Sequence, residues 1–452
     1  MRQQANRLSS TRRNTPIRVR IGIGFVCLLA GCGQVVLAAD GSPDTSFSED
    51  GLRQVAFADS YTDPDSVQVG SDAHGSIFVA TKYLSANIEG FMVLKIKPNG
   101  DNDATFGFGG YASVAFSSAI DTLYGIFPQP DGSVMLFGAA DMNQDEFPVM
   151  AKLTSTGNLD SSFGVGGRLV ITQTPWVSSS LYFEGATRQA DGKFLFVGYC
   201  GCPGQDPTIL LRTSANGVPD PSFGNNGWAS VDRPFSTYIY AVNVDRAGRA
   251  VLAGNSGSQA MVSRVTSSGV LDTSFGSAGT GNVLINVLPN SYANAIGIDS
   301  NDSVVVALAG AGNGTQSRQT GLIRLLVNGD RDMNYAGGFR DLSLEFGSEI
   351  KTLQLRSDGR MVAAGWIDHT GDPGSIGKDF LTARILPNGA LDSSFDGNGL
   401  RRISLSTTYD SAEAMVLSAG KPVIAGISEA NGVQQLGVLR MQSDLIFSGG
   451  FQ

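Results

Sequence analysis

The sequence predicts an all-β protein made of tandem copies of one antiparallel unit of four strands. The main observation is an octapeptide, Asp-x-Ser/Thr-Phe-Gly-x-x-Gly, which recurs at 160–167, 220–227 and 272–279, with looser copies elsewhere. The aromatic residues of successive copies are about 58 residues apart on average: Phe47, Phe106, Phe163, Phe223, Phe275, Tyr335 and Phe395. A period of this size is typical of one supersecondary unit stacked in series or arranged around a ring. No segment shows sustained helical periodicity, so we expect the units to consist of strands.

The first two strands of each unit are predicted from a hairpin signal. Asp191-Gly192 lies between two short apolar or alternating runs, which is typical of a tight β-hairpin. The same turn recurs clearly at Asp131-Gly132 and Asp358-Gly359, and in degraded form at Ala247-Gly248, Asp302-Ser303 and Ala419-Gly420. Each copy leads into an apolar strand, such as 133–138 or 250–254.

A third strand in every unit carries one cation inside an apolar run: Lys95, Lys152, Arg212, Arg264, Arg324, Arg384 and Arg440. A fourth strand follows the Phe-Gly turn, for example at 167–172 and 399–404. Four short antiparallel strands per unit predict the blades of a β-propeller, which protects its sheet edges by arranging the blades around a central channel. The seven cation-bearing strands predict a seven-bladed propeller.

The two ends of the chain are predicted to complete one blade together. Residues 44–57 hold a lone turn and fourth strand, whereas the last complete strand is the cation-bearing one around Arg440. We therefore expect the N-terminal strand, residues 51–57, to form the outer strand of the seventh blade, and Arg440 to pair with Asp44. The tail 444–450 is an eroded eighth copy of the motif and is an alternative occupant of this closing position.

The repeated Leu-Asp-x-Ser-Phe-Gly-x-x-Gly, the Asp-Gly-Lys/Arg hairpin upstream of it and the period near 60 residues resemble the delta-60 repeat family of bacterial propeller-like proteins. The resemblance covers nearly all of residues 40–452. It implies a propeller-like fold and no enzymatic activity common to the family. Three copies depart from the pattern, with Ser48 in place of Gly, Tyr335 in place of Phe and no Ser/Thr before Phe447. These departures affect single turns more than the fold.

Residues 1–39 have the features of a signal peptide, with six Arg, no acid and an apolar stretch from Ile21 to Ala39. Leu29–Cys32 resembles a bacterial lipobox, which would make Cys32 the lipidated first residue. Small residues at Ala38 and Ala39 favour ordinary cleavage instead. We expect a single propeller domain over residues 40–452, exported to the periplasm, the extracellular space or an outer-membrane anchor. No later segment is apolar enough to span a bilayer.

Composition restricts the partners. The chain has 58 Gly and only 16% charged residues, and the part after residue 39 carries 26 cations against 41 anions. An acidic surface argues against nucleic acid or an anionic membrane as partner. We expect a monomer that binds a protein or a carbohydrate at the cell surface.

Cys200 and Cys202 are separated by one residue. Export to an oxidising compartment favours a disulfide between them, and two free thiols are the alternative. Without a nearby His, the pair lacks the four ligands of a structural zinc site.

The chain offers little for catalysis, and no catalytic residue is assigned. It has two histidines, His74 and His369, and it lacks Gly-x-Ser-x-Gly, His-Glu-x-x-His and phosphate-loop patterns. Chemistry that uses two carboxylates facing one cleft, as in glycosidases, stays open. A polysaccharide hydrolase or lyase is therefore the alternative function.

The Asp of the motif can be interpreted as a calcium ligand or as a structural acceptor. An Asp at a fixed turn position accepts backbone N–H bonds, and the cation about eight residues earlier can pair with it. We interpret these residues as structural: Asp44, Asp103, Asp160, Asp220, Asp272, Asp332 and Asp392, with Arg212, Arg264, Arg324, Arg384 and Arg440. Calcium is the candidate cofactor only in two irregular loops, which lack the Gly and distal Glu of a full calcium loop. Their ligand candidates are Asp141, Asn143 and Asp145, and Asp368, Asp372 and Asp379.

The connections from second to third strand and from fourth to first strand share one face, and they vary most in length. Variable loops on a rigid scaffold are where recognition usually occurs. The fourth-to-first connections carry the ligand-binding candidates Tyr61, Trp176, Tyr182, Tyr238, Tyr292 and Tyr409, although aromatic residues at similar repeat positions also fit packing. The sequence thus predicts an exported, non-catalytic binding or scaffold module for a protein or polysaccharide.

Overall fold

The computed structural model describes residues 41–56, 66–85, 88–116, 121–142, 145–175, 180–201, 207–231, 237–276, 279–312, 318–342, 344, 346–369, 377–430 and 432–442. Strands dominate, and no α-helix occurs among these residues. In this part of the chain, none of the helical segments has the length and apolarity to cross a membrane. The predicted signal peptide, its lipobox with Cys32 and the tail 444–450 lie outside the described residues.

Five sheets have four antiparallel strands each, hydrogen-bonded in chain order. They are β2 (Gln68–Ser71), β3 (Ile77–Ser85), β4 (Ile88–Ile96) and β5 (Tyr111–Val114); β6 (Asp121–Pro128), β7 (Val134–Met142), β8 (Asp145–Leu153) and β9 (Arg168–Val170); β10 (Ser180–Arg188), β11 (Phe194–Gly201), β12 (Thr208–Thr213) and β13 (Trp228–Val231); β14 (Thr237–Val244), β15 (Ala250–Ser256), β16 (Gln259–Val265) and β17 (Asn282–Ile285); and β18 (Tyr292–Ile298), β19 (Val304–Ala311), β20 (Arg318–Leu325) and β21 (Arg340–Asp341). A 3-10 turn, η3 (Ala336–Gly338), precedes β21.

The sixth sheet has eight strands. It contains β22 (Ser348–Leu355), β23 (Met361–Asp368), β24 (Lys378–Ile385) and β25 (Leu400–Ile403), and also β26 (Tyr409–Ser418), β27 (Lys421–Ala430), β28 (Val433–Arg440) and β1 (Leu52–Ala56). A single parallel pair, Lys378 with Tyr409, joins the two groups of four. The first strand of the chain is antiparallel to the last one, with Leu52 opposite Leu439 and Ala56 opposite Gln435.

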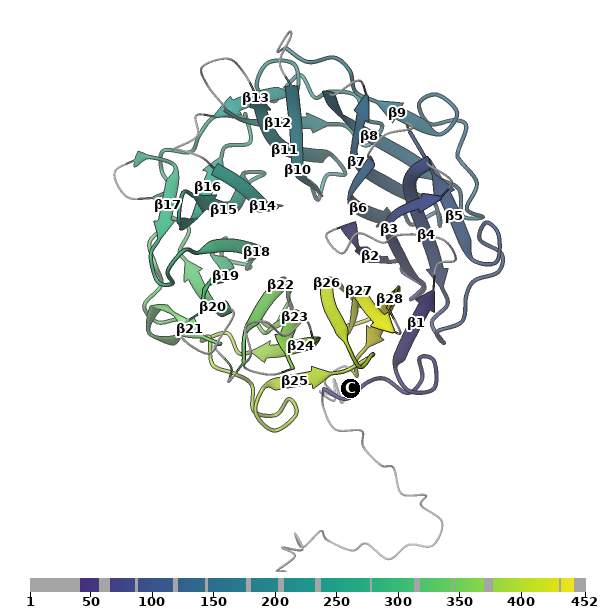
Figure 1. Ribbon diagram of the computed structural model, residues 1–452. Coiled ribbons are helices and arrows are strands. Elements are labelled where there is room, and N and C mark those ends of the chain that lie inside the picture. The colour runs from purple at the N-terminus through teal and green to yellow at the C-terminus, as the bar shows by residue number, and fades with distance from the viewer. Residues whose placement is uncertain are drawn as a thin grey trace, which may run out of the picture. The chain divides into compact units, whose positions relative to one another are not determined.

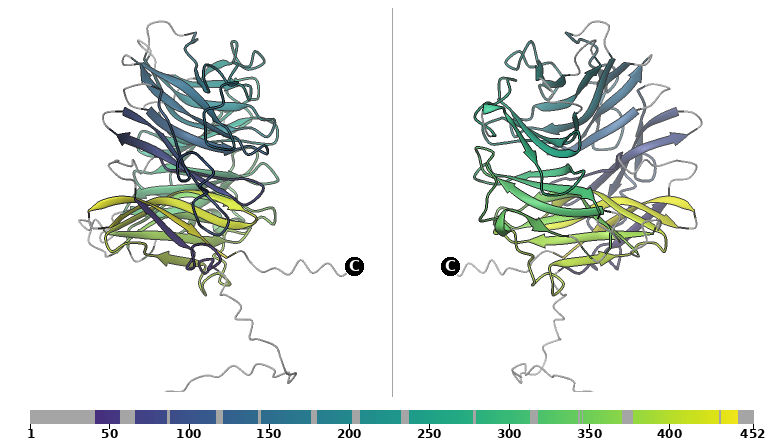
Figure 2. Two further views of the ribbon diagram at one scale, coloured as in Figure 1. Left: turned by 90° about the vertical axis from the view of Figure 1, so that its right-hand side faces the viewer. Right: turned by 60° about the vertical axis from the view of Figure 1, so that its left-hand side comes forward.

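The sheets are arranged radially in the unit Ala39–Gln452, and the first strand of each, from β2 to β26, lies nearest to the centre (Figure 1). First strands of neighbouring sheets contact each other along the chain, and β26 also contacts β2. In the side views of Figure 2 the strands run between two opposite faces. Radial packing of four-stranded antiparallel sheets is the β-propeller fold. The predicted all-β propeller architecture is therefore confirmed.

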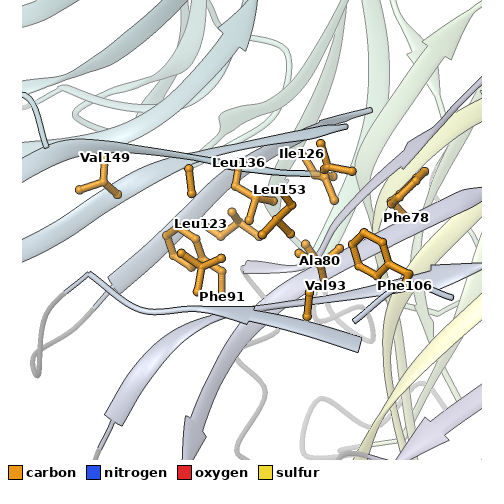
Figure 3. Packing of buried hydrophobic residues seen from close by; sticks show 14 of the residues in the cluster. Phe78, Ala80, Phe91, Val93, Phe106, Leu123, Ile126, Leu136, Val149 and Leu153 are labelled. Carbon is orange, nitrogen blue, oxygen red and sulfur yellow. The ribbon is translucent and has the colours of Figure 1, made fainter. Parts of the chain in front are cut away.

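The apolar core is divided among the junctions between sheets. Figure 3 shows one such cluster, in which Phe78, Phe91 and Phe106 of one sheet pack against Leu123 and Leu136 of the next, all fully or almost fully buried. Successive side chains of a strand point to opposite faces of the sheet, so the continuous apolar run of β7 contributes to two clusters, with Val134 and Leu136 in one and Met135 and Phe137 in the other.

One cluster joins the last strands to the first sheet. Val55 of β1 and Val438 of β28 share it with Val79 of β3 and Leu94 of β4. Burial of apolar area in this cluster stabilises the packing of β1, β27 and β28 against the first sheet.

Candidate ligand-binding face

The repeated Asp is a hydrogen-bond and ion-pair acceptor in every copy. Its Oδ2 lies 2.6–3.0 Å from the cation of the third strand, in the pairs Lys95–Asp103, Lys152–Asp160, Arg212–Asp220, Arg264–Asp272, Arg324–Asp332, Arg384–Asp392 and Arg440–Asp44. Its Oδ1 accepts the backbone N–H two residues later, as from Ser162 to Asp160 at 3.1 Å. Both carboxylate oxygens thus have protein partners, which supports the structural interpretation.

The arginine of the motif also contacts the next sheet. Arg212 Nη1 donates to Ser267 O at 2.7 Å, and Arg324 Nη1 donates to Pro387 O at 2.9 Å. The Arg212 guanidinium also lies over the Phe223 ring, 4.5 Å from its centroid. The repeated motif therefore joins one sheet to its neighbour through the guanidinium group, which also packs on an aromatic ring. We call this linkage the clasp.

The pair between the two ends of the chain has the same geometry. Arg440 Nε donates to Asp44 Oδ2 at 2.8 Å, and Lys421 adds a second cation. Burial would raise the pKa of Asp44, but hydrogen bonds from Lys421 and Ser46 and the charge of Arg440 lower it to about 2.

The candidate ligand-binding site lies at the ends of the strands that are opposite to the repeated turns. Because the strands of each sheet are antiparallel, the Asp-Gly and Phe-Gly turns share one face, here called the turn face. The connections from second to third and from fourth to first strand share the other face, here called the loop face.

Three predicted aromatic candidates occupy one repeated position of the loop face. Tyr182, Tyr238 and Tyr292 each lie two residues before a β-bulge in the first strand of their sheet. Tyr409 lies earlier in its strand, four residues before the bulge. Tyr61 and Trp176 fall outside the described residues.

The bulge recurs in six first strands, where one residue is left out of the register: Tyr124, Glu184, Tyr240, Asn294, Lys351 and Glu413. Bulges redirect side chains, and several of these reach the next first strand. The Tyr124 hydroxyl donates to Phe183 O, and the Ile239 N–H donates to Glu184 Oε2 at 3.1 Å. The bulge residues therefore link neighbouring sheets around the centre.

Glycine in the second strand makes room for this bulge. A Cβ on Gly198 would lie 2.0 Å from Tyr182 O, and one on Gly254 would lie 1.8 Å from Tyr238 O. The same close approach occurs at Gly138, Gly365 and Gly426. An isolated Gly in a strand is a sequence signal for a bulge or a close backbone approach.

Exposed tyrosines lie in the first strands of two neighbouring sheets, towards the loop face. Tyr238 and Tyr240 of β14 are 50% and 49% exposed, although both are large aromatic side chains. Tyr182 is also exposed, and its ring stacks on that of Tyr199 with centroids 4.8 Å apart. The Tyr240 ring contacts that of Tyr292 on the next sheet, with centroids 5.3 Å apart.

A charged cluster continues from these rings. The Arg318 guanidinium lies 5.1 Å from the centre of the Tyr292 ring, and its Nε is 3.1 Å from Glu349 Oε2. Glu349 is buried, and its Oε1 also accepts from Asn294 at 2.6 Å and pairs with Lys351 at 3.4 Å. Burial and the charge of Glu349 raise the pKa of Tyr292, so its phenol stays protonated at neutral pH.

Next to this cluster lies a half-buried lysine, Lys378, beside two aromatic rings. Lys378 Nζ is 3.5 Å from the centre of the Trp366 ring and 5.3 Å from that of Tyr409. Burial lowers the pKa of Lys378, against the charge of Asp368, which raises it. Tyr409 thus packs against a cation, which supports the packing alternative for this candidate.

The loop candidates for calcium have other partners where they are described. Asp379 Oδ1 lies 2.8 Å from His369 Nε2, and its Oδ2 accepts from Arg402. Asp368 is buried opposite Lys378 in the register, and the backbone of Asp141 lies in β7. Asn143, the side chain of Asp145 and Asp372 lie outside the described residues. Within the described ranges, no group of three or more His, Cys, Asp or Glu side chains could hold a metal ion.

Cys200 is fully buried near the end of β11 and is disulfide-bonded. Cys202, its predicted partner, falls outside the described residues. The pairing of these two cysteines stays a prediction.

Two cavities open on the turn face, between neighbouring sheets. One of about 360 Å³ is lined by Lys152, Phe163 and Arg188 of adjoining sheets and by the turn at Ala215. Another of about 340 Å³ is lined by Arg324, Tyr335 and Arg356. The Tyr335 hydroxyl is buried there without a protein partner. These cavities lie away from the predicted loop-face candidates.

Tyr199, Tyr240, Arg318 and Glu349 were not predicted as site residues. The aromatic search covered the fourth-to-first connections, whereas these residues lie inside strands β11, β14, β20 and β22. The glycines opposite the bulges, such as Gly254 and Gly365, could have revealed Tyr240 and Lys351 by their constant offset. No local signal indicates that Arg318 meets Glu349.

The radial sheets and the repeated clasp define the class: this is a β-propeller repeat protein. Residues 129–163 and 356–395 match a family model described as "Domain of unknown function (DUF5122) beta-propeller". The match agrees with the expected bacterial propeller repeat family at that coarse level.

Several solved structures are similar to the chain. The polysaccharide lyase Uly1 has 9% sequence identity, with 84% of this chain and 90% of that chain covered, at a TM-score of 0.48. The β-propeller domain of the Trilobed protease from Pyrococcus furiosus has 9% identity, 87% and 99% coverage, and a TM-score of 0.44. The exo-β-1,3-galactanase 1,3Gal43A from Clostridium thermocellum has 11% identity, 87% and 97% coverage, and a TM-score of 0.34. No curated protein matches the chain.

Proposed function

We propose that this chain is an exported bacterial β-propeller of seven blades that acts as a non-catalytic binding module at the cell surface or in the periplasm. For the blade count, the support is that the eight-stranded sheet consists of two groups of four strands joined through one residue pair. For closure by the N-terminal strand, the support is the β1–β28 pairing and the Arg440–Asp44 ion pair.

The observation that carries the binding function is the group of exposed tyrosines on the loop face. Half-exposed Tyr238 and Tyr240 and exposed Tyr182 offer large amphipathic rings from two neighbouring sheets. Tyrosine supplies contact area at low conformational cost, which is why it is common in binding surfaces. The rigid inner strands hold these rings in place, so little ordering is lost when a ligand binds.

Binding of residues 40–452 to a broad glycan array and to a panel of surface proteins, with and without calcium, tests this proposal. We expect a ligand whose affinity falls about tenfold in Tyr238→Ala and in Tyr240→Ala. Phe108→Ala is the matched control, because this ring is 92% exposed in a turn-face connection. Equal losses in all three variants, or a ligand that none of them affects, would refute a site on the loop face.

A polysaccharide hydrolase or lyase is the second candidate, and Glu146 of the loop face is the observation that favours it. Burial raises the pKa of this carboxyl, although it accepts the Phe183 N–H at 2.9 Å. Raised pKa values are typical of general acids. Product analysis on every glycan hit, with Glu146→Gln as the variant, tests it: turnover that depends on Glu146 would replace the binding-only proposal.

The proposal of export is supported by the N-terminal sequence alone. We propose cleavage after Ala39 rather than lipidation at Cys32. The mass of the mature N-terminus decides between them: a chain beginning at Asp40 supports the soluble form, and a diacylated Cys32 supports the anchored form.

A further inference from the structure

We propose that the turn-face cavity between the sheets β6–β9 and β10–β13 is a second ligand site, which takes a neutral sugar residue through two neighbouring hydroxyls. The cavity of about 360 Å³ is lined by Lys152 on one side and by the turn at Ala215 on the other. It lies on the face opposite to the exposed tyrosines, so the inference goes beyond the proposed function and does not rest on it.

In other copies of the motif, an arginine serves two acceptors at the corresponding place. Arg212 Nη1 donates to Ser267 O of the next sheet at 2.7 Å, and its Nη2 donates to Ser222 Oγ of its own motif at 3.0 Å. Arg264 and Arg440 bond to the equivalent two acceptors. A guanidinium can pair with the motif aspartate and still donate in two further directions.

Lys152 leaves both of the corresponding acceptors without this donor. Its Nζ pairs with Asp160 at 3.0 Å, and within the described residues it makes no hydrogen bond to Ser162 Oγ or to Ala215 O. Ser162 and Ala215 both line the cavity. A serine oxygen and a backbone carbonyl each have lone pairs to accept a hydrogen bond, so a ligand in the cavity can supply the two missing donors.

The backbone link between sheets is also missing at this junction. At five other junctions, the N–H that follows the motif aromatic residue donates to a carbonyl of the next sheet at 2.7–2.9 Å, as from Gly107 to Thr156 O. Among the described residues, the Gly164 N–H makes no such bond to Asn216 O. The turn at Ala215 is therefore not held against the preceding sheet in the repeated way.

The other turn-face cavity, of about 340 Å³, provides a comparison within the same chain. There Arg324 donates to Pro387 O at 2.9 Å, and the Ala336 N–H donates to Asn388 O at 2.9 Å. The carbonyls of that junction already have protein donors, so the unfilled pair of acceptors distinguishes the cavity at Lys152.

The charges around the cavity favour a neutral ligand. Lys152, Arg188 and Asp131 line it, and Asp160 pairs with Lys152. Two cations and two carboxylates balance each other here, so neither an anion nor a cation is favoured by charge.

Two neighbouring hydroxyls of a sugar match the polar groups of the cavity. One hydroxyl can donate to Ser162 Oγ and the other to Ala215 O, and either can accept from the Lys152 ammonium. Met135 and Phe163 add apolar walls, which suit the C–H groups of a sugar ring. The volume falls within the range of about 300–1,000 Å³ that is typical of small-molecule sites.

The test uses the methyl glycosides of glucose, galactose and mannose, each beside its 2-deoxy, 3-deoxy and 4-deoxy forms. Binding to residues 40–452 is measured by ligand-observed NMR and by calorimetric titration. We expect at least one glycoside to bind with a Kd of about 1 mM, and the loss of one hydroxyl in a deoxy form to weaken it about tenfold.

Lys152→Arg is the decisive variant. Its guanidinium should donate to Ser162 Oγ and Ala215 O itself, so the affinity for the sugar should fall about tenfold while the protein becomes more stable. Loss of binding in a stabilised variant cannot result from unfolding. Lys95→Arg is the control, because it is the same change at a junction where the Gly107 N–H already joins the next sheet, and it should bind as wild type does.

Three results overturn the inference. If wild type binds none of the three glycosides, the cavity holds water only. Equal affinity in wild type and Lys152→Arg, or an equal loss in Lys95→Arg, places the sugar elsewhere. Tyr238→Ala separates this site from the loop face: binding that this variant abolishes and Lys152→Arg retains supports the loop-face module and overturns the second site, whereas the reverse pattern supports the second site alone.

Discussion

A single residue of the repeat decides whether the clasp between two sheets is complete. Four arginines of the motif reach a backbone carbonyl of the next sheet: Arg212, Arg264, Arg324 and Arg440. Lys152 occupies the same position and pairs with Asp160, but a cavity of about 360 Å³ lies between it and the turn at Ala215. A lysine side chain ends in one nitrogen. It therefore cannot pair with Asp160 and also reach across the cavity to the backbone carbonyl of Ala215.

Lys152→Arg should therefore stabilise the protein. The new guanidinium can keep the ion pair with Asp160 and also donate to Ala215 O, and we expect the free energy of unfolding to rise by about 1 kcal/mol. Urea denaturation measures it. Arg212→Lys is the reverse change in the next sheet and should cost a similar amount. An unchanged stability in both variants would contradict the role of the clasp.

Asp44 makes stability depend on pH. Its pKa in the folded protein is about 2, below the ordinary value of 3.8. A lowered carboxyl pKa adds stability that is complete above about pH 4 and is lost as the pH falls towards 2. The size of the shift corresponds to about 2 kcal/mol.

Asp44→Asn should thus lower the free energy of unfolding near neutral pH, and the difference from wild type should shrink between about pH 4 and pH 2. Denaturation curves across this range measure the difference. Asp50→Asn changes an exposed aspartate nearby that accepts only a local N–H, and it serves as the control. A difference that does not depend on pH would show that Asp44 acts through packing rather than through its charge.

Six of the described first strands combine regular pairing with one bulge residue, and several of these residues bond to the neighbouring sheet. In β6 this residue is Tyr124, whose buried hydroxyl donates to Phe183 O in β10. Burial, with the charges of Glu146 and Glu184, raises the pKa of Tyr124, so the hydroxyl keeps its proton at neutral pH.

Tyr124→Phe should remove this link while it preserves the ring. The Phe183 carbonyl would then lose its donor, and we expect a loss of about 1–2 kcal/mol in the free energy of unfolding. Thermal unfolding with Tyr182→Phe as the control, an exposed tyrosine of the next sheet, measures the effect. A loss no larger than that of the control would mean that the bulge residues do not hold the sheets together.

The positions of the strands were largely predictable from the sequence, whereas the bulges within them were not. Asp-Gly and Phe-Gly turns are local signals, so they predicted where strands end. Tyr182, Tyr238 and Tyr292 were predicted as residues of the fourth-to-first connections, and the structure places them at or near the start of the first strands β10, β14 and β18. Tyr240 is the bulge residue of β14, so its side chain departs from the regular alternation of the strand. The two-residue period of a strand does not reveal such a change of direction.

At the scale of the whole molecule, the first and the last segments that the structure describes lie side by side. The Gln442 N–H donates to Ser42 O at 2.9 Å, and Pro43 forms an isolated bridge with Met441. In the closed ring that we propose, no sheet is energetically the first or the last.

A circular permutant tests this property. Residues 442 and 41 are joined by a short Gly/Ser linker, and the chain is opened at Gly257, a turn residue with no atom within 4 Å of its missing Cβ. We expect an unchanged far-UV spectrum and a Tm within about 5 °C of wild type. A chain that begins at Ser66 lacks β1 and leaves β28 unpaired, so it should melt earlier and associate. A permutant as unstable as this truncated chain would contradict closure.

The sequence alone determined the repeat, the four strands of each unit and the ion pairs within the motif. These features depend on turn chemistry and on residues about eight positions apart, which interact wherever the unit folds. Only the tertiary structure decided that Tyr240, Tyr292 and Glu349 meet through side chains of three neighbouring sheets, with Arg318 between them. Those contacts depend on the angle at which sheets pack around the ring and on the bulge that turns each inner side chain, and neither is encoded in local spacing.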